Sequence, residues 1–478
     1  MLFNSYIFWV FFAGVIILYR VLPHKLQNRM LLVAGYVFYG SWDWRFLSLL
    51  LITTVVDYVV ALRIAACQLP QGPRPAAKKA WLIFSLCVNL GLLGFFKYYG
   101  FFARECVDLF ERFGLTLSLP TLRVILPVGI SFYTFQSIGY VVDVYRGAAV
   151  PARSFLDYAL YVAFFPQLVA GPIERFNHMM PQIVAPRVSK PGDFAEGLYH
   201  VLVGLFKKVV IADNMAFVVN GIFGSEPSKL SGLDCLMGVY AFAFQVYGDF
   251  SGYSSIAQGI AKWLGFDLMT NFRMPYFAQT PGDFWRRWHI SLSTWLRDYL
   301  YIPLGGNRHG TWQTYRNLML TMFLGGLWHG ANWTFVAWGV LHGALLCAYR
   351  PFERRLRPAE PSARPRAWRS IIAAFIMFHF VCAGWLLFRA DTIGQAWGMF
   401  SQMFTDLRVT PLTTYALATI AFFVGPAMLF ECWIERSQDI LHLTRAALLL
   451  RAGAYSYIAL MMLVFHPTLN YEFIYFQF

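Results

Sequence analysis

His329 is the residue best placed to do chemistry in this sequence, because it stands inside a long apolar run. The run extends from Arg316 to Gly339 and has Trp328-His329-Gly330 near its centre. An ionisable side chain at membrane depth is costly, so by default it indicates a functional site. A free histidine has a pKa of about 6.5 and burial lowers it further, which leaves a neutral base. Such a ring can take a proton from a hydroxyl group that attacks a thioester.

The alternative for His329 is a histidine that only packs within the membrane, as we expect for His342 and His379. Asn332 and Trp333 follow His329 by three and four residues. If the helix continues, they lie on the same face as the imidazole, where either side chain orients the ring.

Gly326 and Gly330 form a GxxxG pair that spans the histidine. This pattern indicates close packing of two membrane helices. Close packing also narrows the space around His329, so the structural and the functional interpretation are compatible.

A second histidine, His289, follows a clear helix start at residues 280–283. There a threonine supplies the capping hydroxyl, proline occupies the first turn and aspartate stands three residues after the cap. Residues 284–299 then give an amphipathic pattern with His289 at the edge of the apolar face. We expect one helix at an interface or over a cavity, with the imidazole directed into the protein. A buried histidine satisfied by a backbone carbonyl is the alternative.

The polar face of that predicted helix is rich in arginine, with Arg286, Arg287 and Arg297. One interpretation is a surface that contacts phospholipid headgroups. The other is a landing site for an anionic donor such as a coenzyme A thioester. The sequence favours neither.

Composition places this chemistry in a membrane. The 478 residues are 58% hydrophobic, 18% aromatic and only 13% charged. Apolar runs of about 20 residues recur along the whole chain, which indicates an all-α polytopic protein. The net charge of +14 comes largely from short loops between these runs, so we interpret it as an orientation signal and expect no nucleic-acid partner. The seven cysteines are scattered and fit small buried hydrophobes.

The spans themselves are predicted from these apolar runs. No charge precedes the first one, whereas Arg20, Lys25 and Arg29 follow it, so the N-terminus should face outward. Proline and glycine at 127–131 and 170–173 predict helix breaks at membrane depth, which are tolerated only against protein or a cavity and so suggest an internal chamber. The tail at 471–478 is almost wholly aromatic and suits a membrane interface or a partner groove. The predicted spans are 6–22, 45–62, 80–96, 124–143, 155–170, 197–219, 232–248, 317–327, 332–349, 370–388, 412–431 and 447–465, with a shorter run at 30–42.

The sequence contains no motif that would support several common classes of enzyme. The ten histidines form no HxxHH or HExxH motif, and no GxSxG elbow or P-loop is present. We therefore predict no metal and no cofactor, which leaves proton transfer by imidazole as the available chemistry.

The motifs together resemble the membrane-bound O-acyltransferase (MBOAT) family. Within it they are similar to the bacterial branch of alginate O-acetyltransferase membrane subunits and teichoic acid D-alanyl transfer proteins. The resemblance covers essentially the whole chain. It is carried by Phe284-Trp285-Arg286-Arg287-Trp288-His289-Ile290-Ser291-Leu292-Ser293, by residues 297–307 and by Gly326-Leu327-Trp328-His329-Gly330-Ala331-Asn332-Trp333, with supporting stretches at 36–40, 127–136, 169–173 and 247–253.

This resemblance implies a single domain, 1–478, of about 11 transmembrane helices with short re-entrant and interfacial helices, arranged as a ring around a central tunnel. The catalytic region would lie at about 240–345, with His329 as the catalytic residue and His289 as a second tunnel residue. The candidate site residues are His329 and His289 for catalysis and Trp285, Arg286, Arg287, Trp288, Ser293, Arg297, Asp298, Trp328, Asn332 and Trp333 for substrate binding.

The predicted activity is a multi-pass O-acetyltransferase of the bacterial inner membrane. In this hypothesis acetyl-CoA or a related thioester donates from the cytoplasm, and a periplasmic partner of the SGNH-hydrolase type acetylates an alginate-like exopolysaccharide. His329 acts as general base, and His289 positions the donor or assists proton transfer. Cellulose and peptidoglycan are alternative acceptors. From another class, a transporter or flippase subunit of an export complex would also use broken helices and a central histidine.

Overall fold

The computed structural model describes residues 1–67, 74–116, 125–356, 367–466 and 473–474, and within these every regular element is a helix. The predicted all-α fold is confirmed. The chain divides into two compact units, Met1–Asp193 with Ile260–Met269, and Phe194–Gly259 with Thr270–Phe478. The aromatic tail lies outside the described residues except for Phe473 and Ile474.

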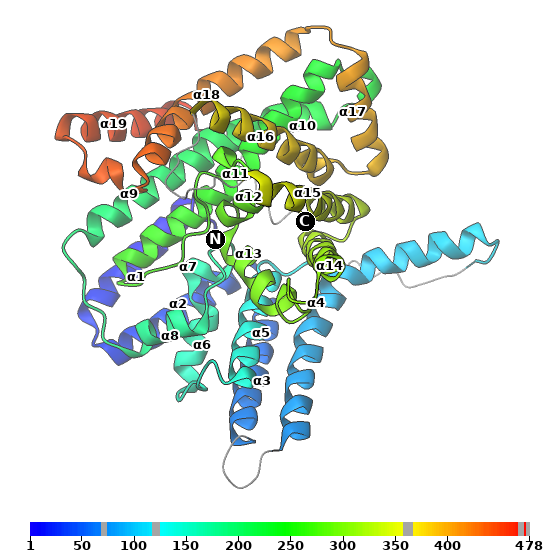
Figure 1. The fold of residues 1–478 in the computed structure, drawn as a ribbon. Helices are drawn as coiled ribbons and strands as arrows, with labels where there is room; N and C mark the ends of the chain where they lie inside the picture. The colour runs from blue at the N-terminus through cyan, green and yellow to red at the C-terminus, as the bar shows by residue number, and fades with distance from the viewer. Residues whose placement is uncertain (68–73, 117–124, 357–366, 467–472, 475–478) are drawn as a thin grey trace. The chain divides into compact units, whose positions relative to one another are not determined.

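The first unit is built from consecutive helices that pack as neighbours. Figure 1 shows α3, α4 and α5 side by side, with α3 in contact with both others. Most helices coincide with predicted spans, although α2 and α4 are longer than expected and the span predicted at 155–170 is split in two. The helices are α1 (Tyr6–Val21), α2 (His24–Asp43), α3 (Leu47–Ala66), α4 (Pro75–Arg112), α5 (Ile130–Arg146), α6 (Phe155–Ala163), α7 (Phe165–Leu168) and α8 (Phe176–Val184).

The two predicted helix breaks meet within this unit. Gly129 precedes α5 with a φ of 73°, which a residue without a side chain adopts at little cost. A Cβ atom on Gly129 would lie 2.6 Å from the carbonyl oxygen of Leu168, the last residue of α7. The chain at the break before α5 therefore packs against the chain at the break after α7, and only glycine fits at the contact.

The second unit carries both candidate catalytic histidines. Most of its helices match the remaining predicted spans, whereas α12, α13 and α17 lie outside every predicted span. From Ile260 onward the end of α11 belongs to the first unit. The helices are α9 (Asp193–Leu205), α10 (Asp213–Phe223), α11 (Gly232–Trp263), α12 (Pro281–Arg287), α13 (Ile290–Leu296), α14 (Thr311–His329), α15 (Trp333–Leu356), α16 (Ala367–Arg389), α17 (Ile393–Thr405), α18 (Pro411–Ser437) and α19 (Leu448–Val464), with π-helical segments at Phe206–Ala212 and Arg297–Tyr301.

Long apolar helices make this a multi-pass membrane protein. Among the described residues, four stretches are long and apolar enough to cross a bilayer: His24–Ala66, Pro75–Arg112, Trp368–Arg389 and Pro411–Ser437. The first of these includes both α2 and α3. The count of about 11 spans stays a prediction.

A buried ion triad connects three parts of the second unit. The Lys208 ammonium lies 2.9 Å from Asp213 Oδ1 and 2.8 Å from Asp249 Oδ1. Lys208 and Asp213 are five positions apart, which is the spacing that a π-helical turn brings onto one face. Asp249, on α11, also accepts a hydrogen bond of 2.6 Å from the backbone N–H of Ile474. The triad therefore joins the π-helical segment, α11 and the described residues of the tail.

Candidate active site

His329 is the last residue of α14, at the turn where the chain reverses into α15. Gly330 follows in an extended conformation, and α15 begins at Trp333. Figure 1 shows α14 and α15 as neighbours. This placement puts the imidazole at the closed end of a helical hairpin, where its side chain is 4% exposed.

Glycines let the two helices of this hairpin touch along their backbones. A Cβ atom on Gly326 would collide with the Phe335 carbonyl oxygen, and one on Gly339 would collide with the Met322 carbonyl oxygen. At Gly330 a Cβ atom would collide with the Phe335 ring. The close packing predicted from the GxxxG pair is confirmed, and α15 supplies the opposing glycine.

Three aromatic rings surround the His329 imidazole. The ring centroids of Trp328 and Trp338 both lie 4.9 Å from that of His329, and the Phe388 centroid lies 5.1 Å away. Each of the three rings is steeply inclined to the imidazole, at 76°, 80° and 72°. The histidine therefore sits in an aromatic cage, the kind of environment that also binds cations through ring faces.

His289 lies between α12 and α13 with a φ of 44°, in the left-handed region. The single continuous helix predicted over 284–299 is therefore wrong. Asn271 explains the break, since its carbonyl accepts the Ile290 N–H at 2.9 Å and its side-chain oxygen accepts the Ser291 hydroxyl at 3.0 Å. These bonds stabilise an irregular backbone that a helical wheel cannot represent.

The break directs His289 into the protein, as the sequence predicted. Its side chain is 1% exposed. Its ring centroid lies 4.6 Å from that of Phe250 and 5.9 Å from that of Trp328. Because Trp328 also contacts His329, one indole is shared by both histidines, and the two predicted catalytic residues lie in one cluster.

A third histidine, His342, belongs to the same cluster, although the sequence indicated only a packing role. It is 1% exposed, and its ring centroid is 4.8 Å from that of Trp338 and 5.1 Å from that of Trp285. Within the described part of the chain, neither ring nitrogen of His342 has a hydrogen-bond partner. The signal available in the sequence was the spacing of Trp338 and His342, four residues apart and so on one helix face.

Replacing His342 with phenylalanine should raise stability and lower turnover. Two unpaired buried nitrogens cost about 1–3 kcal/mol each, and a phenyl ring would fill the site without that cost. A polar ring kept at such a cost beside a reaction centre indicates a functional use. The measurements are the thermal midpoint in detergent and the catalytic rate of the purified protein.

His379→Phe is the control for this change, because its two ring nitrogens are satisfied by the Tyr240 hydroxyl at 2.6 Å and the Phe375 carbonyl at 2.8 Å. It should destabilise the protein, since it leaves the Tyr240 hydroxyl unpaired. A His342→Phe protein with a lower midpoint and full activity would show that His342 only packs.

Among the predicted binding residues, Trp285 and Trp288 join this cluster, as Trp328 does. Trp285 packs against Trp338 with 5.7 Å between ring centroids, and Trp288 packs against Trp385 at 4.8 Å. Ser293 donates a hydrogen bond from its hydroxyl to the Trp288 carbonyl at 3.1 Å, so it stabilises the backbone between α12 and α13.

The charged residues among the predicted binding residues form ion pairs and do not join the histidine cluster. Arg287 binds Asp283 at 3.1 Å and Glu435 at 2.9 Å. Arg297 binds its neighbour Asp298 at 2.7 Å, with most of its side chain exposed. Arg286 is mostly exposed and lies 3.8 Å from Asp283. No described contact joins these arginines to the histidines, so their role toward a donor stays a prediction.

Asn332 and Trp333 do not lie on the face of His329, and this expectation is wrong. The helix on which it depended ends at His329 itself. Asn332 instead donates to the Asp391 carbonyl at 3.0 Å and accepts from the Thr334 N–H at 3.1 Å, which caps the start of α15. Trp333 is 53% exposed.

The cluster is suited to proton transfer in a dry environment. It combines three buried imidazoles with apolar rings, and the described residues contain no group of three histidine, cysteine, aspartate or glutamate side chains able to hold a metal ion. Exclusion of water by the rings would strengthen electrostatic interactions at the reacting atoms and limit hydrolysis of a reactive intermediate.

Comparison with known proteins agrees with this chemistry. Residues 148–388 match the model of the membrane-bound O-acyltransferase family. The chain is 43% identical to a probable alginate O-acetylase of Azotobacter vinelandii over 88% of this chain and 83% of the relative. It is 40% identical to a peptidoglycan O-acetyltransferase of Helicobacter pylori over 80% and 75%, and 28% identical to a teichoic acid D-alanyltransferase of Bacillus subtilis over 55% and 68%.

Proposed function

Because this chain belongs to the membrane-bound O-acyltransferase family and is a multi-pass membrane O-acyltransferase, we propose that it transfers acetyl from acetyl-CoA to a hydroxyl acceptor across the bacterial inner membrane. The donor enters from the cytoplasmic side and the acceptor from the periplasmic side, with the N-terminus outward. The single observation that carries the proposal is the location of His329 in an aromatic cage, with Trp328 shared with His289.

In this mechanism His329 is the general base. Its neutral imidazole takes the proton of the acceptor hydroxyl as the oxygen attacks the thioester carbonyl, and the carbon–sulfur bond then breaks to release the thiolate of coenzyme A. The proton passes from the imidazolium to that thiolate, so the ring returns to its neutral form. A cation–π interaction with a tryptophan face contributes about 0.5–2 kcal/mol to a charged ring, and the Trp328 and Trp338 centroids lie within its range, at 4.9 Å.

The acceptor that we favour is a periplasmic partner of the SGNH-hydrolase type, which passes the acetyl group to an alginate-like exopolysaccharide. The similarity to alginate O-acetylases supports this polymer class. Peptidoglycan is the second candidate, because a relative named for that activity is nearly as similar. The membrane lipid surrounds the apolar helices, and we propose no metal or cofactor.

The test uses the purified full-length protein in sealed liposomes of known orientation. Radiolabelled acetyl-CoA is supplied on one side, and an SGNH-type partner with either alginate or peptidoglycan fragments on the other. We expect release of coenzyme A and labelled acceptor only when the donor meets the cytoplasmic face. Movement of intact acetyl-CoA, without cleavage of the thioester, would instead identify a transporter.

His289 should contribute less than His329 to the rate of acetyl transfer, but its contribution should be measurable. Because asparagine tolerates the left-handed backbone better than most residues, His289→Asn removes the imidazole with little strain. We expect acetyl transfer to fall by about 10- to 100-fold, toward the lower end of acid–base effects, without loss of folded protein.

Gln438→Asn is the matched control for this variant, since Gln438 also has a positive φ, 56°, and is exposed. It should keep full activity. If both variants keep it, His289 has neither a positioning nor a proton-transfer role.

A further inference from the structure

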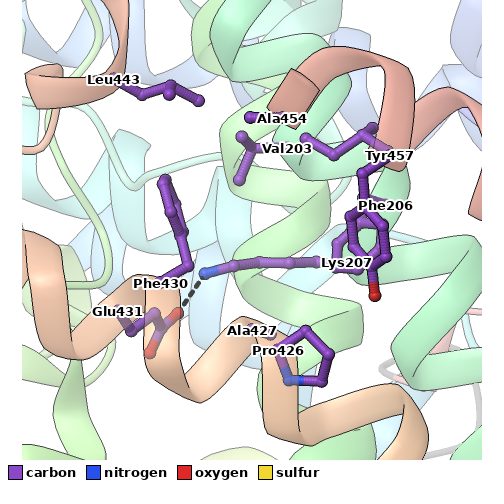
Figure 2. Close-up of a pocket in the computed structure, with 11 residues that line it drawn as sticks. Val203, Phe206, Lys207, Pro426, Ala427, Phe430, Glu431, Leu443, Ala454 and Tyr457 are labelled. Carbon is purple, nitrogen blue, oxygen red and sulfur yellow. Dashed lines mark hydrogen bonds and ion pairs between the residues drawn. The ribbon is translucent and has the colours of Figure 1, made fainter. Parts of the chain in front are cut away.

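The second unit contains a sizeable apolar cavity whose lining includes none of the residues of the histidine cluster. Its volume is about 290 Å³, and it is bounded by α9 with the following π-helical segment, by α18 and by α19. For comparison, an engineered apolar cavity of about 150 Å³ binds benzene. Figure 2 shows its walls, which are the side chains of Val203, Phe206, Lys207, Pro426, Ala427, Phe430, Glu431, Leu443, Ala454, Tyr457 and Ile458.

One wall of this apolar cavity carries an ion pair. The Lys207 ammonium lies 2.7 Å from Glu431 Oε1, as the dashed line in Figure 2 marks. The same carboxylate oxygen accepts the Tyr247 hydroxyl at 2.6 Å. The pair therefore forms a polar, electrically balanced spot on a wall that is otherwise almost entirely hydrocarbon.

A smaller polar cavity of about 70 Å³ shares this wall. Val203, Lys207, Phe430 and Glu431 line both cavities, so the two meet at the ion pair. The rest of the smaller cavity is rich in hydroxyl and amide groups. These come from Tyr199, Tyr247, Ser251, Ser255, Gln258 and Thr270.

One buried oxygen at this junction is unsatisfied. Glu431 Oε2 is buried and has no hydrogen-bond partner among the residues that the structure describes. A buried acceptor without a donor costs about 1–3 kcal/mol, and more when it is charged. A ligand that brings hydroxyl donors to this point would remove that cost.

From these observations we propose that the two cavities form one site for a single-chain amphiphile with a neutral, hydroxyl-bearing head, such as a monoacylglycerol. The hydrocarbon chain occupies the apolar cavity, whose wall on α18 belongs to an apolar membrane-length helix. The head lies in the polar cavity and donates to Glu431 Oε2. A neutral head fits because Lys207 and Glu431 already balance each other's charge, so a carboxylate or a quaternary amine would add a buried charge without a counter-ion of its own.

This site is distinct from the histidine cluster but adjacent to it. Phe272 lines the polar cavity, and its ring stacks on that of His289 with 6.4 Å between centroids. The proposal concerns binding alone, so its test requires no acetyl transfer and is independent of the proposed function.

The test is native mass spectrometry of the full-length protein from phosphatidylcholine nanodiscs, whose lipid head carries no hydroxyl. The probes are 1-monolauroylglycerol, lauric acid and lauryltrimethylammonium, which share a chain length. We expect a saturable one-to-one adduct with monolauroylglycerol, held at least about tenfold more tightly than the charged probes, since one well-made buried hydrogen bond gives a difference of this size. Equal retention of all three probes, or preference for a charged one, would overturn the proposed head group.

Two tryptophan variants of α18 locate the site. Ala427→Trp fills the apolar cavity and should abolish the adduct, whereas Leu429→Trp places the same ring on the exposed side of that helix and should keep it. The thermal midpoint of each variant shows that it is folded. An adduct that survives in a folded Ala427→Trp protein would place the amphiphile elsewhere and refute the site.

Discussion

Replacing His329 by glutamine is expected to reduce acetyl transfer by about 10²- to 10⁴-fold, the range that a general base contributes. Glutamine keeps a polar side chain of similar reach at the end of α14 but cannot accept a proton at neutral pH. The neighbouring rings of Trp338 and Phe388 should hold their positions, because they also pack on each other and on the rest of the apolar cluster. The measurement is the rate of coenzyme A release by the purified variant with donor and acceptor present.

The control for this variant is His379→Gln, on α16. That imidazole is satisfied by the Tyr240 hydroxyl and the Phe375 carbonyl, and it has no described contact with His329. We expect nearly normal turnover from it. Normal turnover by a folded His329→Gln protein would refute the general-base mechanism, whereas loss of turnover in both variants would indicate a structural effect.

Replacing Lys208 by methionine is expected to cost about 3–5 kcal/mol of stability, because it leaves Asp213 and Asp249 buried without their cation. The side chains of all three residues are at least nine-tenths buried, so water cannot replace the ammonium. The expected result is a large fall in the thermal midpoint and in the yield of folded protein. Adding Asp249→Asn should recover part of the loss, because it removes one of the two unpaired charges.

Lys229→Met is the comparison for this variant. Lys229 also pairs with a carboxylate, Glu226 at 2.9 Å, but both side chains are mostly exposed. Surface pairs of this kind contribute about 0–1 kcal/mol, so the midpoint should hardly change. Equal effects of the two substitutions would show that the buried triad does not stabilise the fold.

The helices of this protein could largely be predicted from the sequence, because hydrophobic runs of membrane length leave few alternatives. The helix breaks beside Gly129 and Gly171 were also predictable, since proline and glycine disrupt a helix by local chemistry. The proximity of His289 and His329 was predicted only from the resemblance to a family. The two residues are 40 positions apart, and no local sequence pattern brings them together.

The failures have a common physical cause, which is that a helical wheel assumes a continuous helix. Asn271 lies outside the predicted helix at 284–299, yet its hydrogen bonds interrupt it at His289. The end of α14 at His329 breaks the same assumption, because Gly330 is extended and α15 begins anew at Trp333. The lack of hydrogen-bond partners for the ring nitrogens of His342 could not be predicted either, because it is visible only in three dimensions.

The π-helical segment at Phe206–Ala212 has a consequence for how this chain tolerates insertions and deletions. Lys208 and Asp213 can pair because a π turn aligns residues five apart. Deleting one residue between them would restore ordinary α-helical spacing, in which residues four apart share a face, so the ion pair itself would survive. Every residue of α10 would nevertheless turn by about 100° about the helix axis and lose its packing partners. In this segment the length of the chain is therefore more tightly constrained than the identity of the residues between Lys208 and Asp213.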